Sequence, residues 1–198
     1  MPTSMTYVEP LALYLTLYRH VNGPGATVAF PGSYANYIHT YTASSQDIIA
    51  RSELYLSIKK ADQAHEEAFN TADNAAPQSW ALIWPTMCEY FELRGESASP
   101  KDKGWKDIDK WWFTHQDQYN KMCEEYGLRP REIPEASWTF LSAGFSLLCR
   151  NRELSLDKIR SVGFTEEYPI GYGYFQVLER LTQDKIIPSK GDWAGHTA

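Results

Sequence analysis

Histidine and cysteine are the residues of this chain most able to hold a metal ion or to act as nucleophiles, and their spacing favours neither role. The five histidines show none of the HxH, HxxxH or HExxH spacings that direct two imidazoles at one metal ion. The three cysteines, Cys88, Cys123 and Cys149, are far apart and contain no CxxC pair. The sequence therefore predicts no metal site and no disulfide framework.

The glycines do not form a dinucleotide-binding turn. Such a turn needs a GxGxxG-type run between a strand and a helix, because only glycine lets the backbone approach the pyrophosphate. Gly23, Gly25 and Gly32 each adjoin a proline and serve turns, whereas Gly171 and Gly173 precede a helix but lack a third glycine. No GxSxG turn presents a nucleophilic serine. The sequence therefore predicts an activity that uses no bound cofactor.

Aromatic residues are the remaining chemical feature of the chain. They make up 14% of it, with thirteen tyrosines and seven tryptophans. At that density they either fill a core or line a pocket for a large apolar ligand. Both interpretations stay open for each individual side chain.

Composition and charge narrow the possible partners. With 198 residues and 43% hydrophobic residues the chain is expected to form one globular domain with a real core. Its formal net charge of −6 argues against nucleic acid, since phosphate binding needs a basic face. No signal peptide and no apolar run of membrane length are present. We therefore expect a cytoplasmic protein with no membrane partner.

Hydrophobic spacing predicts a mainly helical chain with two or three short strands. Apolar residues recur at helical spacing from Leu11 to Val21, and the turn at Gly23 ends that helix. Ser45 is expected to cap the following helix. Other expected elements are helices at Trp80–Phe91, Asp107–Tyr126, Trp138–Cys149 (capped by Ser137) and Gly171–Lys185, strands at Thr27–Phe30 and Ala68–Ala72, and a polar tail at Lys190–Ala198.

The order of several segments resembles a known family. The segments are LALYLTLYRHVNGPGATVAFPG, then SYANYIHTYTASSQDIIARSELYLSIKK, then EEAFNTADNAAPQSWALIWPTMCEYFEL, then SLDKIRSVGFTEEY and VLERLTQDKIIP. Their order is similar to the C-terminal, substrate-binding half of extended short-chain dehydrogenase/reductases of the progesterone 5β-reductase/iridoid synthase-like group. The resemblance covers residues 11–188.

The resemblance implies a substrate domain without its Rossmann core. Residues 1–10 are then a lead-in, 11–188 the substrate-binding-like domain and 189–198 a flexible tail. The family's catalytic Tyr and Lys have no counterpart, because the Tyr55 and Lys59 pair sits on a helix that is not catalytic in the family. A strand at Phe69–Ala72 would lose its sheet partners, and unpaired edges and bare apolar surface are costly in water. We therefore expect a homodimer.

The resemblance also implies a set of site residues. In the family, the first helix, the FPG segment and the helix matching Trp138–Cys149 lie near the substrate, and neighbouring tryptophans add flat walls. The catalytic candidates are His39, Tyr34 and Tyr14. The substrate-binding candidates are Tyr18, Trp111, Trp112, Trp138, Ser142, Phe145, Ser146 and Cys149.

The function expected from this resemblance is a cofactor-independent cyclase of Diels–Alder or other pericyclic type. Its aromatic pocket would fold an apolar polyene or terpenoid carbonyl of secondary metabolism, since orientation alone can supply much of the rate. Tyr, His or Trp donors would polarise the carbonyl. The alternatives are a double-bond isomerase or epimerase with His39 as base, a non-catalytic binding or partner subunit, and a fragment of an NAD(P)H-dependent ene-reductase.

Overall fold

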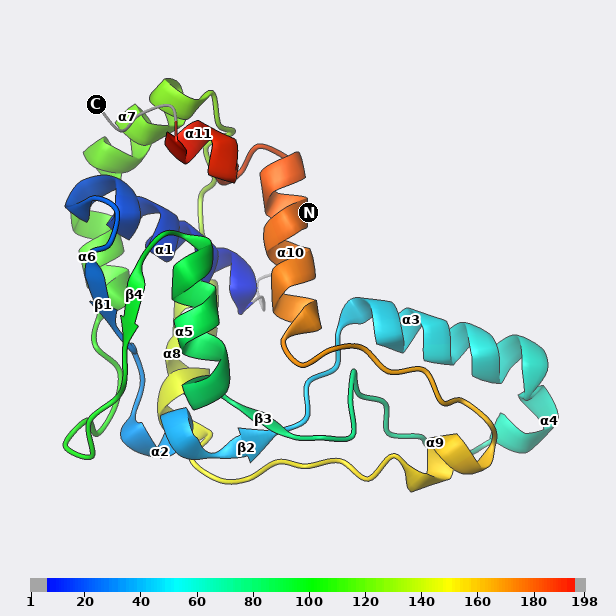
Figure 1. Ribbon diagram of the computed structural model, residues 1–198. Helices are drawn as coiled ribbons and strands as arrows, with labels where there is room; N and C mark the ends of the chain where they lie inside the picture. The colour runs from blue at the N-terminus through cyan, green and yellow to red at the C-terminus, as the bar shows by residue number, and fades with distance from the viewer. Residues whose placement is uncertain (1–6, 195–198) are drawn as a thin grey trace.

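The computed structural model describes residues 7–194 and divides into a larger body and a smaller arm (Figure 1). The helices of the body are α1 (Val8–Asn22), α2 (Tyr34–Ile38), α5 (Trp80–Tyr90), α6 (Ile108–Thr114), α7 (Gln116–Tyr126), α8 (Glu135–Leu147), α10 (Tyr172–Gln183) and α11 (Lys190–Ala194). Its strands are β1 (Thr27–Ala29), β2 (Thr40–Tyr41), β3 (Gln78–Ser79) and β4 (Arg94–Glu96). The described chain is thus mainly helical with a few short strands, which confirms the predicted fold class at that level.

Helix α1 forms the centre of the body. Its leucines Leu11, Leu13, Leu15 and Leu17 are at most 1% exposed although they point in different directions around the helix. A helix that is apolar on every side must be surrounded, and α1 contacts α7, α8 and α10. It ends at Gly23, whose φ of 82° suits glycine and whose N–H donates to the Arg19 carbonyl at 2.9 Å.

Two short strands pack beside α5. Strands β1 and β4 pair in parallel, with Val28 opposite Gly95. A Cβ on Gly95 would lie 2.9 Å from the Trp84 ring, so glycine is what lets β4 approach α5 this closely. Trp84 is fully buried and contacts the edge of the Phe30 ring. This aromatic packing explains why much of the aromatic content is core.

The arm extends away from the body, to the right in Figure 1. It contains α3 (Gln46–Leu54), the π-helix η1 (Tyr55–Lys59), α4 (Ala61–Ala64) and α9 (Asp157–Ser161). The Ser45 hydroxyl accepts the Ile48 N–H at 3.3 Å, which confirms the predicted cap. The arm has its own small core, formed by Ile48, Ala72, Leu156, Ile159 and Phe164.

The predicted strand at Ala68–Ala72 is wrong, because this segment is irregular. A strand needs a neighbouring strand for its backbone groups, and no other strand pairs with it within residues 7–194. Isolated hydrogen bonds hold the segment instead. Ser44 donates its hydroxyl to the Thr71 carbonyl at 2.6 Å, and the Asn70 side chain donates to the Ser155 carbonyl at 3.2 Å.

The predicted continuous helix at Asp107–Tyr126 is also wrong. It breaks at His115 into α6 and α7. The His115 ring stacks on Trp111 at 4.0 Å and hydrogen-bonds through Nδ1 to the Trp111 carbonyl at 2.8 Å. The Thr114 hydroxyl donates to the same carbonyl at 2.9 Å, and the Gln116 side chain donates to the Trp112 carbonyl at 2.9 Å. Side chains thus take up carbonyls at the end of α6, and neither glycine nor proline marks the break in the sequence.

Two further boundaries differ from the expectation. Helix α8 begins at Glu135, directly after Pro134, so Ser137 lies within its first turn and does not cap it. Part of the predicted polar tail forms α11, where Trp193 is buried under the Arg19 guanidinium at 4.2 Å. Most of the predicted lead-in and residues 195–198 of the tail lie outside the described residues.

Candidate functional site

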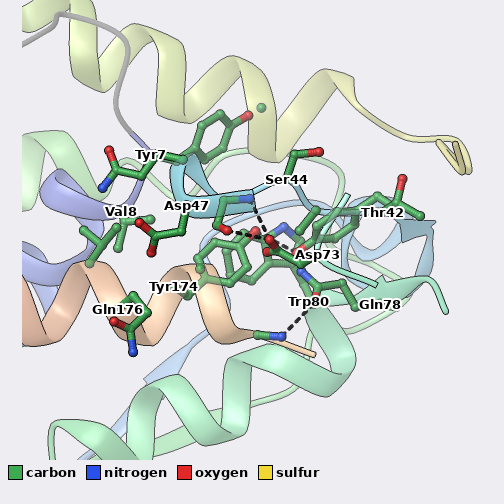
Figure 2. A pocket seen from close by; sticks show the side chains of 18 of the residues that line it. Tyr7, Val8, Thr42, Ser44, Asp47, Asp73, Gln78, Trp80, Tyr174 and Gln176 are labelled. Carbon is green, nitrogen blue, oxygen red and sulfur yellow. Dashed lines mark hydrogen bonds between the residues drawn. The ribbon is translucent and has the colours of Figure 1, made fainter. Parts of the chain in front are cut away.

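A cavity of about 760 Å³ lies where the start of α3 joins the body (Figure 2). Its walls come from the start of α1, the segment from β2 to α3, the β3 strand, the end of α8 with the chain after it, and α10. This volume is typical of small-molecule sites. Trp80 and Leu148 supply apolar surface, while Tyr7, Tyr41 and Tyr174 supply hydroxyl groups.

Backbone pairing makes three polar side chains project from the same face of the small sheet around β2. Tyr41 lies opposite Gln78 in the antiparallel pair of β2 and β3, and it bridges to Arg152 on the other edge. The Thr42 N–H donates to the Arg152 carbonyl at 3.0 Å, and the Arg152 backbone N–H donates to the Thr40 carbonyl at 2.9 Å. Residues directly opposite in a sheet project from the same face. Tyr41, Gln78 and Arg152 therefore all project toward the cavity, which each of them lines.

Tyr41 and Tyr174 form a hydrogen-bonded pair inside the cavity, with their hydroxyl oxygens 2.9 Å apart. Tyr174 belongs to the first turn of α10, whose start is held against β3 by the Gly171 N–H donating to Gln78 Oε1 at 3.0 Å. Burial raises the pKa of Tyr174 well above its usual 10, and it also raises the pKa of Tyr41. Both phenols are therefore neutral hydroxyl groups at physiological pH.

Tyr7 brings a third phenol to the cavity wall. Its ring packs against the edge of Phe140 at 4.9 Å. Its hydroxyl lies against Gly144 of α8, where a Cβ would come within 1.1 Å of the hydroxyl oxygen. Glycine at this position therefore makes the notch that holds Tyr7. Burial raises the pKa of Tyr7, although the nearby Arg152 charge opposes this effect.

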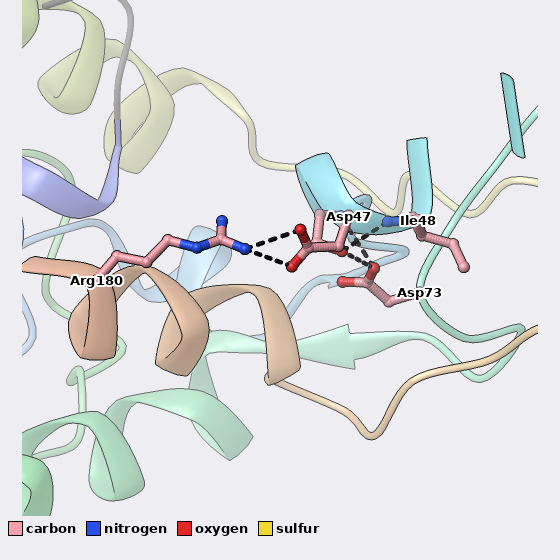
Figure 3. Close-up of polar contacts among 5 residues, drawn as sticks. Asp47, Ile48, Asp73 and Arg180 are labelled. Carbon is pink, nitrogen blue, oxygen red and sulfur yellow. Dashed lines mark hydrogen bonds and ion pairs between the residues drawn. The ribbon is translucent and has the colours of Figure 1, made fainter. Parts of the chain in front are cut away.

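Two carboxylates at the junction are already engaged by the protein (Figure 3). Asp47 accepts hydrogen bonds from Arg180 of α10 at 2.8 Å and 2.9 Å. Asp73 accepts from the Ser45 N–H at 3.0 Å and from the Ser45 hydroxyl at 2.5 Å. These bonds fix the start of α3 against α10 and so set the shape of the cavity.

The residues at the start of α10 do not fit the pyrophosphate of a dinucleotide. A phosphate site at a helix start needs open N–H groups and glycines that leave room for the ligand. A Cβ on Gly173 would instead meet the Ser45 side chain at 3.0 Å and Asp73 Oδ2 at 3.3 Å. The space above Gly173 is thus filled by the chain's own groups, and one of them is a carboxylate that would repel phosphate.

The arrangement is suited to holding and polarising a carbonyl group. The tyrosine pair has two hydroxyl protons and uses one of them in its mutual hydrogen bond. The other proton can be donated to an oxygen in the cavity, where low dielectric strengthens the bond. Because the phenols are neutral, they act there as hydrogen-bond donors and not as bases.

None of the residues predicted to form the site lines this cavity, although all of them are described. The structure brings one group together on α1 and α6, where the Trp111 ring lies 5.4 Å from Tyr14 and 5.5 Å from Tyr18. The Tyr18 hydroxyl donates to the Thr27 carbonyl at 2.8 Å. Trp112 and Trp138, both 2% exposed, pack together in the core with ring centres 5.7 Å apart.

The other predicted residues lie on or near α8 and α2. Phe145 is buried and packs 4.7 Å from the Trp80 ring, so it supports the cavity from behind. The Ser142 hydroxyl donates to the Thr139 carbonyl at 3.0 Å, and the Cys149 thiol donates to the Ser146 carbonyl at 2.9 Å.

At α2, His39 hydrogen-bonds to the Ala35 carbonyl through Nδ1, and Tyr34 is partly exposed at the helix start. The structure therefore does not bring the three predicted catalytic residues, Tyr14, Tyr34 and His39, to the cavity. Their catalytic roles stay predictions.

The structure adds three facts about metals, thiols and membranes. Within residues 7–194, no three His, Cys, Asp or Glu side chains are grouped to hold a metal ion. Cys88 is fully buried, and burial raises the pKa of its thiol, as suits an inert core cysteine. The described helices include none with both the length and the apolar character needed to cross a bilayer.

Sequence reasoning missed the residues that line the cavity. Tyr41, Gln78, Arg152 and Tyr174 are far apart in the chain and meet only through strand pairing and the docking of α10. The one local signal was the GYG run at the start of α10, where Gly171 has a φ of 80° and Gly173 lets the helix lie against Ser45.

Comparison with known proteins supports the family resemblance. A family model described as a PRISE-like Rossmann-fold domain matches residues 4–188. The short chain dehydrogenase ausT of Aspergillus calidoustus is 51% identical over 94% of this chain and 45% of its own length. The short chain dehydrogenase sirR of Leptosphaeria maculans is 31% identical, over 90% of this chain and 46% of its own length.

A plant relative is more distant. The 3-oxo-Delta(4,5)-steroid 5-beta-reductase of Arabidopsis thaliana is 24% identical over 93% of this chain and 45% of its own length. The chain therefore spans about half the length of the curated relatives it matches.

Proposed function

The chain belongs to the PRISE-like Rossmann-fold domain family within the short-chain dehydrogenases, and on this basis we propose that it binds an apolar conjugated carbonyl compound in the cavity between α10 and α3. The tyrosine pair of Tyr41 and Tyr174 carries the proposal. It offers a hydroxyl proton to a carbonyl oxygen inside an otherwise largely apolar chamber. The substrate class is a small secondary metabolite with a polyene or terpenoid skeleton.

The proposed reaction is a cofactor-independent cyclisation. Cyclisation of a polyene carbonyl requires a folded conformer and a polarised carbonyl, but no nucleophile and no redox partner. The cavity walls hold the polyene substrate in the reacting conformation, which lowers the entropic part of the activation barrier. The hydroxyl of the tyrosine pair stabilises the negative charge that develops on the carbonyl oxygen. A double-bond isomerisation that passes through an enol would use the same donor.

A second function is favoured by the names of the relatives. Two are named short chain dehydrogenases, and one is named a reductase of a 3-oxo-Delta(4,5)-steroid, which is an enone. In this alternative, the chain corresponds to the substrate-binding half of such a reductase, and the tyrosine pair orients the enone for reduction. The match to about half the length of each relative supports this alternative, in which the Rossmann core lies elsewhere.

The test follows the carbonyl itself. We expect all-trans-retinal labelled with ¹³C at its carbonyl to bind, and its C=O stretching frequency to fall on binding because the bond is polarised. The double variant with Tyr41→Phe and Tyr174→Phe should bind retinal but restore the frequency toward that of retinal in an apolar solvent. Tyr34→Phe is the matched control, since Tyr34 does not line the cavity, and it should change nothing.

Two outcomes would reject the proposal or redirect it. Retinal that binds with an unshifted carbonyl frequency would reject polarisation by the tyrosine pair. Both functions predict that this chain alone binds no NADPH, since the residues at the start of α10 do not fit a dinucleotide phosphate and the reductase alternative places the Rossmann core elsewhere. A shifted carbonyl together with a cyclic product formed from a polyene carbonyl without NADPH would favour cyclisation.

We also propose that a second copy of the chain covers the exposed face of the arm. Leu54 and Ile58, on α3 and η1, are 60% and 74% exposed, and such residues grouped on one helical face commonly mark an interface. Light scattering should give a dimer at micromolar concentration. The variant Leu54→Glu with Ile58→Glu should give a monomer, and a monomer in the unaltered chain would contradict this proposal.

A further inference from the structure

Two buried donors at the cavity lack a well-formed hydrogen bond within residues 7–194. Gln78 is 4% exposed, its Oε1 accepts from Gly171, and its Nε2 is buried beside the Tyr41 hydroxyl without a hydrogen bond of full geometry. The Nη1 of Arg152 is likewise buried and unpartnered. Buried donors of this kind are rare because losing water without a replacement is costly. Their position suggests that a ligand supplies the acceptor.

The other charged side chains that line the cavity already have a hydrogen-bond or ion-pair partner within the protein. Asp47 pairs with Arg180, Asp73 with Ser45, and Glu9 with Arg131 at 2.8 Å. By contrast, no carboxylate among the described residues lies within ion-pair distance of Arg152. Its guanidinium carbon instead lies 5.6 Å from the centre of the Tyr41 ring. Arg152 is therefore the cationic group lining the cavity that has no carboxylate partner among the described residues.

We propose that Arg152 and Gln78 bind an anionic oxygen of the substrate, so that the ligand is an apolar acid and not a neutral compound. An acid oxygen can accept from Arg152 Nη1 and Gln78 Nε2 together, because strand pairing with Tyr41 projects both side chains from one face. The inference rests on the proposed function and narrows its substrate class. The ligand carries a conjugated apolar skeleton and a carboxylate or an ionised enol next to the carbonyl that the tyrosine pair binds.

The test compares two probes that share a skeleton and differ in the head group. All-trans-retinoic acid carries a carboxylate, and all-trans-retinol carries a neutral hydroxyl. Binding is measured by quenching of tryptophan fluorescence, since Trp80 lines the cavity. In the unaltered chain we expect retinoate to bind about tenfold more tightly than retinol or better, as a charge-assisted hydrogen bond implies.

Three variants and a control separate the head-group site from the fold. Arg152→Met should weaken retinoate binding about tenfold and leave retinol binding within about twofold. Arg152→Lys should recover part of the loss. Gln78→Glu keeps the oxygen that accepts from Gly171 but replaces the donor with a second oxygen, so it should weaken retinoate selectively. Arg150→Met is the matched control, because Arg150 is exposed and does not line the cavity.

The outcomes distinguish this inference from the function on which it rests. If retinal and retinol bind but retinoate has no advantage, or if Arg152→Met weakens both retinoids alike, the acid-binding inference is overturned and the carbonyl proposal stands. If no retinoid binds at all, the proposed function is rejected and the inference is rejected with it. A retinoate preference that Arg152→Met abolishes supports both.

Discussion

The body and the arm differ in how completely they bury their apolar side chains. In the body, helix α1 is buried on every side, and the Phe30 ring packs tilted against Trp80 and edge to face with Trp84 in the same core. In the arm, the small core of Ile48, Ala72, Leu156, Ile159 and Phe164 lies under one face of α3, while Leu54 and Ile58 on α3 and η1 are exposed.

The difference indicates which region can stand alone. Burial of apolar area drives folding, so the body has the means to be stable by itself, whereas the arm has little core for its length. The cavity lies between the two, and one of its walls is the start of α3. Its shape therefore depends on the weaker region being held to the stronger one.

The largest expected effect is a truncation in the body. Trp84→Ala should lower the free energy of unfolding by about 3–5 kcal/mol, because it removes a fully buried ring next to Phe30 and β4. Urea unfolding measures this. The matched change in the arm, Leu54→Ala, removes a side chain that is 60% exposed in the single chain and should cost less than about 0.5 kcal/mol when measured on the monomer. Equal losses at the two positions would break the comparison.

The next largest effect is expected at alkaline pH, which should lower the stability of the body. Burial raises the pKa of Tyr14, Tyr41, Tyr119 and Tyr174 in the folded state. Below pH 10 both states keep these protons, so stability is unaffected. Above pH 10 the unfolded chain ionises first, and stability should fall by up to about 1.4 kcal/mol per pH unit for each tyrosine.

Tryptophan fluorescence during urea unfolding at pH 9 to 11 tests this, since all seven tryptophans lie outside the arm. The Tyr41→Phe, Tyr174→Phe double variant should show a shallower decline with pH. Stability that rises above pH 10 would contradict the assignment of these hydroxyl groups as buried and neutral.

A truncation in the arm core should have a smaller and more local effect. Phe164 is 4% exposed and packs against Tyr55 with ring centres 5.5 Å apart. We expect Phe164→Ala to cost about 1–3 kcal/mol, limited by the low stability of the arm itself. Hydrogen exchange should show lost protection in α3 and α9 with α1 and α5 unchanged. Uniform loss across both regions would show that the chain unfolds as one unit.

The smallest effect is expected at the ion pair that joins the regions. Asp47 and Arg180 have side chains that are 28% and 40% exposed, so their coupling in a double-mutant cycle with Asp47→Asn and Arg180→Gln should be about 0.2–1 kcal/mol. It should weaken further at high salt. A coupling energy that is large and independent of salt would mean that the pair is shielded from water.

Much of the fold was predictable because local chemistry specifies it. The Ser45 cap and the helix end at Gly23 both follow from short-range rules, and the structure has both. The break at His115 was not predictable, because it depends on one imidazole stacking on Trp111. The strand expected at Ala68–Ala72 failed because strand formation depends on a partner outside the segment.

The cavity could not be predicted from local sequence rules either, because it also depends on contacts between distant segments. Tyr41 was not singled out by any motif, and its role depends on Gln78 and Arg152 pairing with β2 from two distant parts of the chain. The aromatic content correctly suggested a core or a pocket. Only the packing could decide which tyrosines lie in the core and which line the pocket. It places Tyr14 in the core and Tyr174 at the cavity.

The contact between α1 and α10 has a consequence for how the protein is made. A ribosome adds about 5–20 residues per second, so α1 leaves the exit tunnel on the order of ten seconds before α10 does. During that interval the leucines of α1 lack one of the helices that cover them, and the cavity lacks a wall. The newly made chain should therefore expose apolar surface of α1 until α10 is released, and ligand binding should follow that release.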